Sequence, residues 1–246
     1  MNSRVILVSD DRSSLRSPDT LLWPDAACMR GIHTGEWTAH IFEYAMSFEG
    51  NMTQVRELAA ANGVGVLHPH GALATDPPGL VVCDVDSTVT RTEAIDLLAE
   101  CAGKADEIRG ITARAMAGEL DFTQSLYARV RCLEGLHIGA LEEAWKATVI
   151  TPGTAELVAA AHEVGAAVGL VSGGFTALVD PLAEQIGADF AASHELEIVD
   201  DHLTGRVVGD IIDRAAKATW LRRWASERGV ALERTIALGD GANDLD

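Results

Sequence analysis

The sequence predicts an α/β protein with a doubly wound parallel sheet, an inserted helical cap and a small amino-terminal α/β region. Apolar residues form 48% of the chain and aromatic residues only 5%, a profile typical of close helix–sheet packing. After residue 150 short apolar strands alternate with helices, whereas residues 91–150 show helical patterns alone. A chain of 246 residues can form one domain or two small ones with a sizeable core.

Charge and cysteine content argue against several partners and locations. The 19 Lys and Arg residues against 37 Asp and Glu residues give a net charge of −18, which disfavours nucleic acid and anionic membranes as partners. The four cysteines are widely spaced, so we expect reduced thiols. The apolar stretch among the first residues is too short for a signal peptide, which together with the thiols predicts a cytoplasmic protein. The longest largely apolar stretch, 155–171, contains charged residues, so we expect no membrane span.

Residues 1–75 predict a small α/β region without a catalytic motif. Strands are expected at 4–9 and 64–68, one or two strands at 36–48, and a helix at 52–62. The segment 72–79 predicts a linker, because its Pro-Pro-Gly end can continue neither a helix nor a strand ladder. The role of this region cannot be derived from its residues.

The apolar run that begins at Leu80 ends in two carboxylates, Asp84 and Asp86. It predicts a buried parallel strand whose carboxyl end opens into a ligand crevice. Residues two apart in an extended segment point to the same side, so both carboxylates can face one site. Such a pair suits a nucleophile that also holds a metal, beside a general acid/base. A solvated Asp-x-Asp turn explains this motif equally well when it is taken alone.

Residues 91–150 predict a cap inserted between two strands. Thr90 to Glu93 resembles a capping box that begins a helix at 94–101. Because no strand interrupts this block, an inserted cap is favoured over a simple crossover. Three further helices are expected, at 105–117, 122–133 and 140–147.

A strand–helix alternation follows the cap and predicts the rest of the sheet. Ser172-Gly173-Gly174 is expected to form a turn after a strand, and the segment 239–244 follows the last strand. The alternation places functional groups at the carboxyl ends of parallel strands. The expected elements are helices at 154–164, 175–186 and 214–228, strands at 166–171 and 235–238, and a hairpin of 195–199 with 203–208.

Three strand ends carry residues that can bind or react, and parallel strands would bring these ends to one edge of the sheet. Each pattern alone is more typical of a turn, and Lys217 alone is more typical of a solvated lysine. Their order and placement together indicate one site. The three sets are Asp84 with Asp86, Ser172 with Gly173, and Asp240 with Asn243 and Asp244.

These residues form four motifs: Asp84-Val85-Asp86-Ser87-Thr88, Val171-Ser172-Gly173-Gly174-Phe175, Lys217, and Gly239-Asp240-Gly241-Ala242-Asn243-Asp244. The set resembles the motifs of the haloacid dehalogenase superfamily, and within it the phosphoserine phosphatases, which the cap segment 114–126 also resembles. The resemblance covers about 79–246 and implies a Rossmann-like phosphatase domain with its helical cap at about 91–150. Residues 1–75 are only loosely similar to the amino-terminal regions of bacterial members.

The resemblance implies a role for each motif in the hydrolysis of a phosphate ester. Asp84 would be the nucleophile and Asp86 the general acid/base. Mg²⁺ would bind to a carboxylate oxygen of Asp84, the backbone carbonyl of Asp86 and the carboxylate of Asp240. The phosphate oxygens would be held by Ser172, the Gly173 amide and Lys217, which also offsets the repulsion between Asp84 and the incoming dianion.

Substrate choice is expected to lie in the cap. A phosphoserine head carries one ammonium and one carboxylate, and by the resemblance Glu93 and Arg129 stand at the positions that recognise them. Met116 and Phe122 would close over the substrate and exclude water, and Asn243 is expected to contribute to binding. The residues alone also allow a helix-capping role for Glu93 and a surface position for Arg129.

The activity implied is Mg²⁺-dependent hydrolysis of O-phospho-L-serine to L-serine and phosphate through an aspartyl-phosphate, the last step of serine biosynthesis. The alternatives are a phosphatase for another small phosphorylated amino acid such as phosphohomoserine, or a non-catalytic amino-acid sensor using residues 1–75. The expected partner is a small molecule, and assembly as a homodimer is left open. Because members of this family continue past the fourth motif, we expect the carboxyl-terminal part of the fold to be missing.

Overall fold

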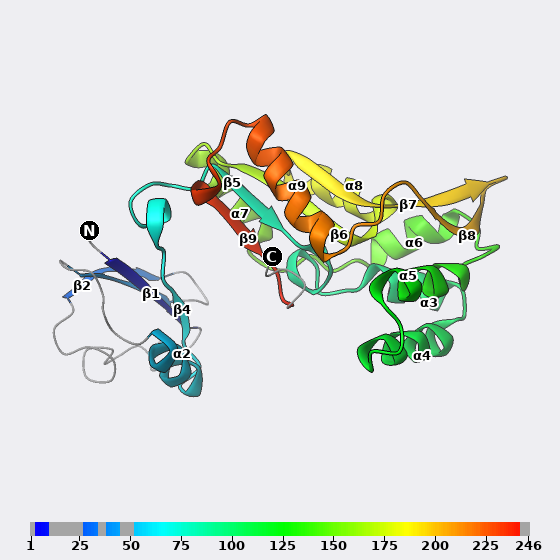
Figure 1. The fold of residues 1–246 in the computed structure, drawn as a ribbon, viewed down its shortest axis with the longest axis horizontal. Helices are drawn as coiled ribbons and strands as arrows, with labels where there is room; N and C mark the ends of the chain where they lie inside the picture. Colours follow the sequence, from blue (N-terminus) through cyan, green and yellow to red (C-terminus); the bar gives the residue numbers. More distant parts are fainter. Residues whose placement is uncertain (1–2, 10–26, 34–37, 45–51, 242–246) are drawn as a thin grey trace. The chain divides into compact units, whose positions relative to one another are not determined.

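The computed structural model describes residues 3–9, 27–33, 38–44 and 52–241, and the chain divides into two compact units, Met1–Asp76 and Pro77–Asp246 (Figure 1). The predicted Asn243 and Asp244 lie outside the described residues. No helix in the described ranges is long and apolar enough to cross a membrane.

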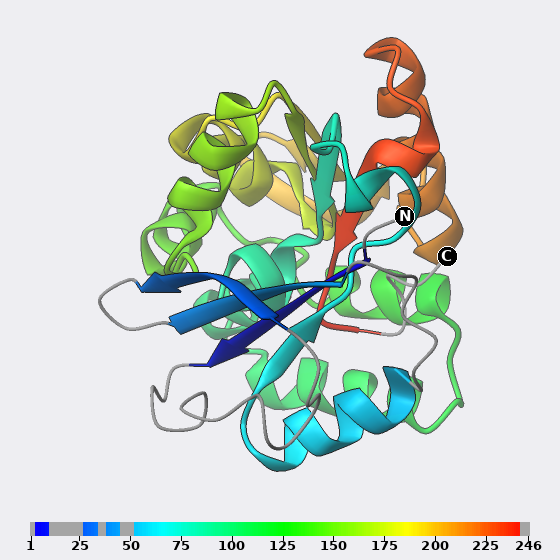
Figure 2. The same cartoon turned by 90° about the vertical axis from the view of Figure 1, so that its left-hand side faces the viewer.

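The first unit is an antiparallel sheet with the strand order β2-β3-β1-β4, one described α-helix, α2, and a short 3-10 helix at Gly71–Ala74 (Figure 2). The central strand β1 pairs with β3 along its whole length and with β4 on its other side, and its Leu7 is buried. The predicted strands at 4–9 and 64–68 and the helix at 52–62 are confirmed, and the segment 36–48 contains one described strand. The elements are β1 (Ser3–Ser9), β2 (Ala27–His33), β3 (Thr38–Tyr44), α2 (Met52–Ala61) and β4 (Gly65–Leu67).

Strand β2 was not predicted, and the sequence shows why. Ala27–His33 includes a glycine and does not alternate apolar and polar residues, so it lacks the period-two signal of a half-buried strand. Its pairing with β3 also shifts register between Cys28 and Arg30. The strand therefore depends on its neighbour in the sheet rather than on local sequence preference.

The second unit contains a five-stranded sheet with the order β8-β7-β6-β5-β9. Strand β5 lies between β6 and β9 and is parallel to both, β7 is parallel to β6, and β8 forms an antiparallel hairpin with β7. The carboxyl ends of β5, β6 and β9 therefore meet at one edge, as predicted. The strands are β5 (Leu80–Cys83), β6 (Ala167–Phe175), β7 (Phe190–Val199), β8 (His202–Val208) and β9 (Thr235–Leu238).

Helices cover both faces of this sheet, which confirms the predicted doubly wound architecture (Figure 1). Side chains alternate along β5: Leu80 and Val82 pack with Trp224 of α9 (Arg214–Glu227). Val81 and Cys83 pack on the opposite face with α7 and α8. All four residues of β5 are buried, which is why it reads as a continuous apolar run. The two helices on that face are α7 (Thr154–Glu163) and α8 (Thr176–Ile186).

Two chain segments connect the cap to the sheet domain, and they pair with each other through a short antiparallel bridge between Thr90 and Ile150. Its helices enclose an apolar cluster that includes Leu98, Ile108 and Leu133, all fully buried. All four helices lie within two residues of their predicted bounds. They are α3 (Ala94–Cys101), α4 (Ala105–Met116), α5 (Phe122–Arg131) and α6 (Gly139–Ala147).

Two local predictions were wrong. Thr90 does not cap α3: the N-cap residue is Glu93, its side chain makes no cap bond, and the Asp86 carboxylate accepts from the Ala94 N–H instead (2.9 Å). Ser172-Gly173-Gly174 does not form a separate turn but continues β6, with a shift in its register to β7 between Val171 and Phe175. Both differences arise at the edge of the sheet where the predicted site residues gather.

Close packing of α9 on the sheet leads to a stability prediction. A Cβ atom on Gly169 would lie 2.7 Å from two ring carbons of the buried Trp224. We expect Gly169→Ala to lower the free energy of unfolding by about 1–3 kcal/mol, because the ring or the helix must shift. Urea denaturation measures the change. Gly110→Ala is the control: nothing lies within 4 Å of its Cβ position in α4, so it should be neutral or stabilising. Equal stability of both variants would contradict the packing described.

Candidate active site

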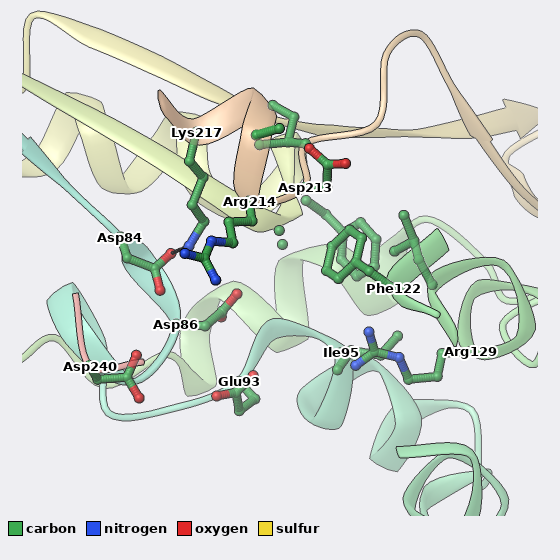
Figure 3. Close-up of a pocket in the computed structure, with 16 residues that line it drawn as sticks. Asp84, Asp86, Glu93, Ile95, Phe122, Arg129, Asp213, Arg214, Lys217 and Asp240 are labelled. Carbon is green, nitrogen blue, oxygen red and sulfur yellow. Dashed lines mark ion pairs between the residues drawn. The ribbon is translucent and has the colours of Figure 1, made fainter. Parts of the chain in front are cut away.

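A pocket of about 610 Å³ lies where the carboxyl ends of the sheet strands face the cap (Figure 3). Figure 3 shows Lys217 and Arg214 extending from the start of α9 toward Asp84, while Phe122 and Arg129 enter from α5. The sheet edge and the cap thus contribute different functional groups to one cavity. Its lining residues are Asp84, Asp86, Glu93, Ile95, Phe122, Leu126, Arg129, Gly173, Gly174, Phe175, Ile212, Asp213, Arg214, Ala215, Lys217 and Asp240.

Asp84 and Lys217 form a buried ion pair at the base of this pocket. The Lys217 Nζ lies 2.8 Å from an Asp84 Oδ1, and the two side chains are 11% and 9% exposed. The Asp84 N–H donates to the Leu238 carbonyl (2.8 Å), which extends the pairing of β5 with β9 up to the carboxylate. The sheet therefore fixes the backbone of Asp84, and the lysine fixes one of its carboxylate oxygens.

The Asp86 carboxyl is held by two donors, the Ala94 N–H (2.9 Å) and the Ser172 hydroxyl (3.3 Å). The pKa of Asp86 is raised to about 6, chiefly by burial and also by the nearby charges of Glu93 and Asp84, against the lowering effect of the two hydrogen bonds. A carboxyl with such a pKa can exchange a proton near neutral pH. Asp86 thus has the property required of a general acid/base.

The turn after β5 arranges two further acidic residues around the pocket. Ser87 has a φ of +59°, which is uncommon for a residue with a side chain, and its hydroxyl donates to a Glu93 carboxylate oxygen (2.6 Å). The Thr88 hydroxyl donates to Asp240 (3.4 Å). This turn thereby connects the strand end that carries Asp84 to the start of the cap and to the end of β9.

The donor atoms at this edge suit Mg²⁺. Asp84, Asp86 and Asp240 line the same pocket, and carboxylate and carbonyl oxygens are the ligands that this hard cation prefers. Among the residues that the structure describes, no three His, Cys, Asp or Glu side chains are already gathered as a metal cluster. The chemistry of the donors therefore fits the metal.

On the cap side, Glu93 and Arg129 face the same cavity. The Arg129 Nε donates to the Ser125 carbonyl (3.3 Å). Burial lowers the pKa of Arg129, while the carboxylates of Glu93, Asp96 and Asp86 act in the opposite direction. A carboxylate and a guanidinium are thus available in one pocket for a ligand that carries both charges.

The predicted residues are not all brought together. Phe122 lines the pocket and is 41% exposed, whereas Met116 is 86% exposed and does not line it. Ser172 is completely buried, with its hydroxyl directed to Asp86 rather than to the cavity. Its role and that of Met116 stay predictions, as does that of Asn243, which lies outside the described residues.

The sequence did not predict Arg214 or Asp213, which also line the pocket. Asp213 caps α9 by accepting from the Ala216 N–H (2.8 Å). Arg214 lies three residues before Lys217, and residues at this spacing share one face of a helix. Because Lys217 was already a candidate, this spacing was the available signal for Arg214.

A model of the haloacid dehalogenase-like hydrolases matches residues 81–246. The chain belongs to this family. The resemblance inferred from the four motifs is therefore confirmed, and the sheet with its cap and its acidic strand ends is the fold of a haloacid dehalogenase-like hydrolase.

Within these hydrolases, the chain is similar to proteins named phosphoserine phosphatase. One from Streptomyces coelicolor is 50% identical over 188 residues, which cover 76% of this chain and 46% of that protein. One from Streptococcus thermophilus is 48% identical, covering 68% of this chain and 78% of that protein. The solved structure of a probable phosphoserine phosphatase from Vibrio cholerae, in unliganded form, has a TM-score of 0.80 at 34% identity and covers 98% of this chain and 74% of that chain. The chain spans about half the length of the Streptomyces relative.

Proposed function

We propose that this protein is a Mg²⁺-dependent phosphoserine phosphatase. The observation that carries the proposal is the content of one pocket: the Asp84–Lys217 pair and Asp86 at the sheet edge face Glu93 and Arg129 of the cap. The first group suits a phosphate ester, and the second matches the ammonium and carboxylate of an amino acid. The names of the similar proteins support the same substrate.

In the first half of the proposed reaction, an Asp84 oxygen attacks phosphorus and forms an aspartyl-phosphate while the bond to the serine oxygen breaks. Asp86, whose raised pKa allows it to hold a proton, donates that proton to the departing oxygen. Lys217 lies 2.8 Å from Asp84 and offsets the repulsion between the carboxylate and the phosphate dianion. The products of this half are free serine and the protein phosphorylated on Asp84.

In the second half, Asp86 is ionised and removes a proton from the water that attacks the aspartyl-phosphate, which releases phosphate and restores Asp84. When bound by Asp84, the Asp86 backbone carbonyl and Asp240, Mg²⁺ would supply positive charge that neutralises the phosphate oxygens. The family is generally metal-dependent, which agrees with this donor set. The chain's own residues thus provide both the nucleophile and the proton relay.

Binding is assigned to both sides of the pocket. Ser172, the Gly173 amide and Lys217 would hold the phosphate oxygens, with Asn243 nearby in the fourth motif. Glu93 would bind the ammonium and Arg129 the carboxylate. Phe122, already at the pocket, and Met116 would cover the bound substrate and exclude water.

We assign the activity to residues 79–246, with the cap at about 91–150, and leave the role of residues 1–75 open. All the described candidates lie in the second compact unit. Cys83, Cys101 and Cys132 are free thiols, which supports a cytoplasmic location. The ligand is a small molecule, and a homodimer is compatible with the proposal.

Phosphate release from a panel of esters tests the proposal. With Mg²⁺ present, kcat/KM for phosphoserine should exceed the values for phosphohomoserine, phosphothreonine and a sugar phosphate. Phosphohomoserine is one methylene longer, phosphothreonine carries an extra methyl beside the ester oxygen, and a sugar phosphate lacks the ammonium and carboxylate. Preference for phosphohomoserine would select the alternative amino-acid phosphatase. If the folded protein hydrolysed none of these esters but still bound serine, an amino-acid sensor would be favoured.

A substitution on the cap tests how the substrate is recognised. Arg129→Ala should raise KM for phosphoserine by about tenfold or more, while KM for p-nitrophenyl phosphate changes little, because only phosphoserine has a carboxylate for the guanidinium. Arg131→Ala, two residues along the same helix and outside this pocket, is the matched control. Equal losses on both substrates would show that Arg129 supports the cap rather than the ligand.

A further inference from the structure

His194 is an ionisable side chain at the site that the proposed reaction does not use. It lies on β7, is completely buried, and has no place among the motifs found in the sequence. Its ring stands between two segments of the phosphate side of the pocket: the end of β6 and the loop that leads into α9.

Both ring nitrogens of His194 are bonded to backbone. The Ile212 N–H donates to Nε2 (2.8 Å), so this nitrogen must present a lone pair. The proton therefore sits on Nδ1, which donates to the Gly173 carbonyl (3.0 Å). Burial lowers the pKa of His194, against the opposing effect of the Gly173 and Gly174 backbone, in agreement with a neutral ring.

These two bonds join the elements that carry the phosphate-binding groups. Gly173 lies in the stretch where the register of β6 and β7 shifts, between Val171 and Phe175, and the imidazole gives its carbonyl a partner there. Ile212 directly precedes Asp213, the N-cap of the helix that carries Lys217. The ring centroids of Phe122 and His194 lie 6.2 Å apart, so the cap packs against the ring that links these two segments.

We propose that His194 is a positioning residue that fixes the distance between the Gly173 amide and the start of α9, and thereby sets the affinity of the site for the phosphate group. The inference rests on the proposed function, in which Gly173 and Lys217 hold the phosphate oxygens. No described backbone hydrogen bond joins Gly173 directly to Ile212. The two hydrogen bonds of the buried His194 ring therefore restrict the movement of the end of β6 relative to the loop before α9. Small displacements of binding groups weaken binding and catalysis strongly.

Three substitutions separate the two bonds. His194→Asn places an amide nitrogen near the position of Nδ1 and retains the donor to Gly173, whereas His194→Gln places an amide oxygen near Nε2 and retains the acceptor for Ile212. His194→Leu removes both. Val158→Ala, a buried residue packed against the other face of the sheet, is the control for a general loss of stability.

The probe is inorganic phosphate, and calorimetry measures its dissociation constant for each Mg²⁺-loaded variant. Urea denaturation of the same variants measures their stability. We expect the constant to rise severalfold for Asn and Gln and by about tenfold or more for Leu, with serine affinity unchanged. Val158→Ala should lose stability and keep phosphate affinity. Should the Leu variant fail to fold, the Asn and Gln variants decide.

Unchanged phosphate affinity in the Asn and Gln variants, with a loss of stability like that of Val158→Ala, would overturn the inference and make His194 a core residue only. An equal loss of serine affinity would also contradict it, because the whole pocket would then be disturbed. Phosphate binding does not depend on the substrate's identity. A parent protein that binds phosphate but does not hydrolyse phosphoserine would therefore refute the proposed function and leave this measurement valid.

Discussion

Replacement of Asp84 by asparagine should lower the turnover of phosphoserine by at least ~10³-fold. The amide has the size of the carboxylate but is a far weaker nucleophile, so no aspartyl-phosphate can form. It also removes the negative charge that lies 2.8 Å from Lys217 and one oxygen donor for Mg²⁺. The loss should appear in kcat, because the interactions that bind the serine head lie on the cap.

Rapid-quench experiments with labelled phosphoserine check this assignment. The parent protein should give an acid-stable phosphorylated peptide that contains Asp84, and the variant should give none. Asp201→Asn is a matched control, since Asp201 is exposed in the β7–β8 turn at a φ of +60°, a conformation that asparagine tolerates well. A phosphoryl group trapped on any other residue would falsify the role of Asp84.

The parts of the fold that the sequence predicted are those in which local pattern and tertiary environment agree. Strand β5 has all four residues buried between two layers of helices, so its apolar run could be recognised directly. The helices of the cap have apolar stripes and polar faces, and their bounds were correct within two residues. Parallel pairing then brought Asp84 and Asp240 to one edge without further information.

The errors arose where a tertiary contact overrides local preference. Thr90 to Glu93 has the residue types of a capping box, but the donor at Ala94 is satisfied by Asp86, eight residues earlier. Glu93 is thereby left to accept from Ser87 and to face the pocket. Two glycines after Ser172 suggested a turn, yet the segment extends β6. Such competition between partners cannot be read from spacing alone.

The site shows the same division. Residues in motifs were found because several of them recur in order, whereas His194 stands alone in a strand. Its importance depends on two backbone partners, 21 residues before it and 18 residues after it. Arg214 is intermediate, since its spacing from Lys217 would have indicated a shared helix face. Single residues that act through distant backbone groups need the structure.

Replacement of Asp86 by asparagine should separate catalysis from stability. The amide retains an acceptor for the Ala94 N–H and can donate to the Ser172 hydroxyl, so both contacts of the carboxyl can persist. It cannot donate a proton to the departing serine oxygen or remove one from water. We expect kcat to fall by ~10²–10⁴-fold, the usual contribution of general acid–base catalysis, as measured by phosphate release at saturating phosphoserine.

The same change should make the metal-free fold more stable above pH 6. The Asp86 carboxyl has a pKa of about 6 in the folded state against a usual value of 3.8, so between these values the folded state keeps a proton that the unfolded state has released. Stability therefore falls as the pH rises from 4 to 6, by at most about 3 kcal/mol, and the loss persists at higher pH. Asparagine has no such titration. Urea denaturation in EDTA measures the free energy of unfolding of both proteins at each pH. The two values should be equal below pH 4, where both side chains are neutral, and the variant should become the more stable protein as the pH rises from 4 to 6. If the unfolding free energies of the two proteins changed with pH in the same way, the folded state would tolerate the ionised Asp86 carboxylate without metal. Burial would then not raise the pKa of Asp86.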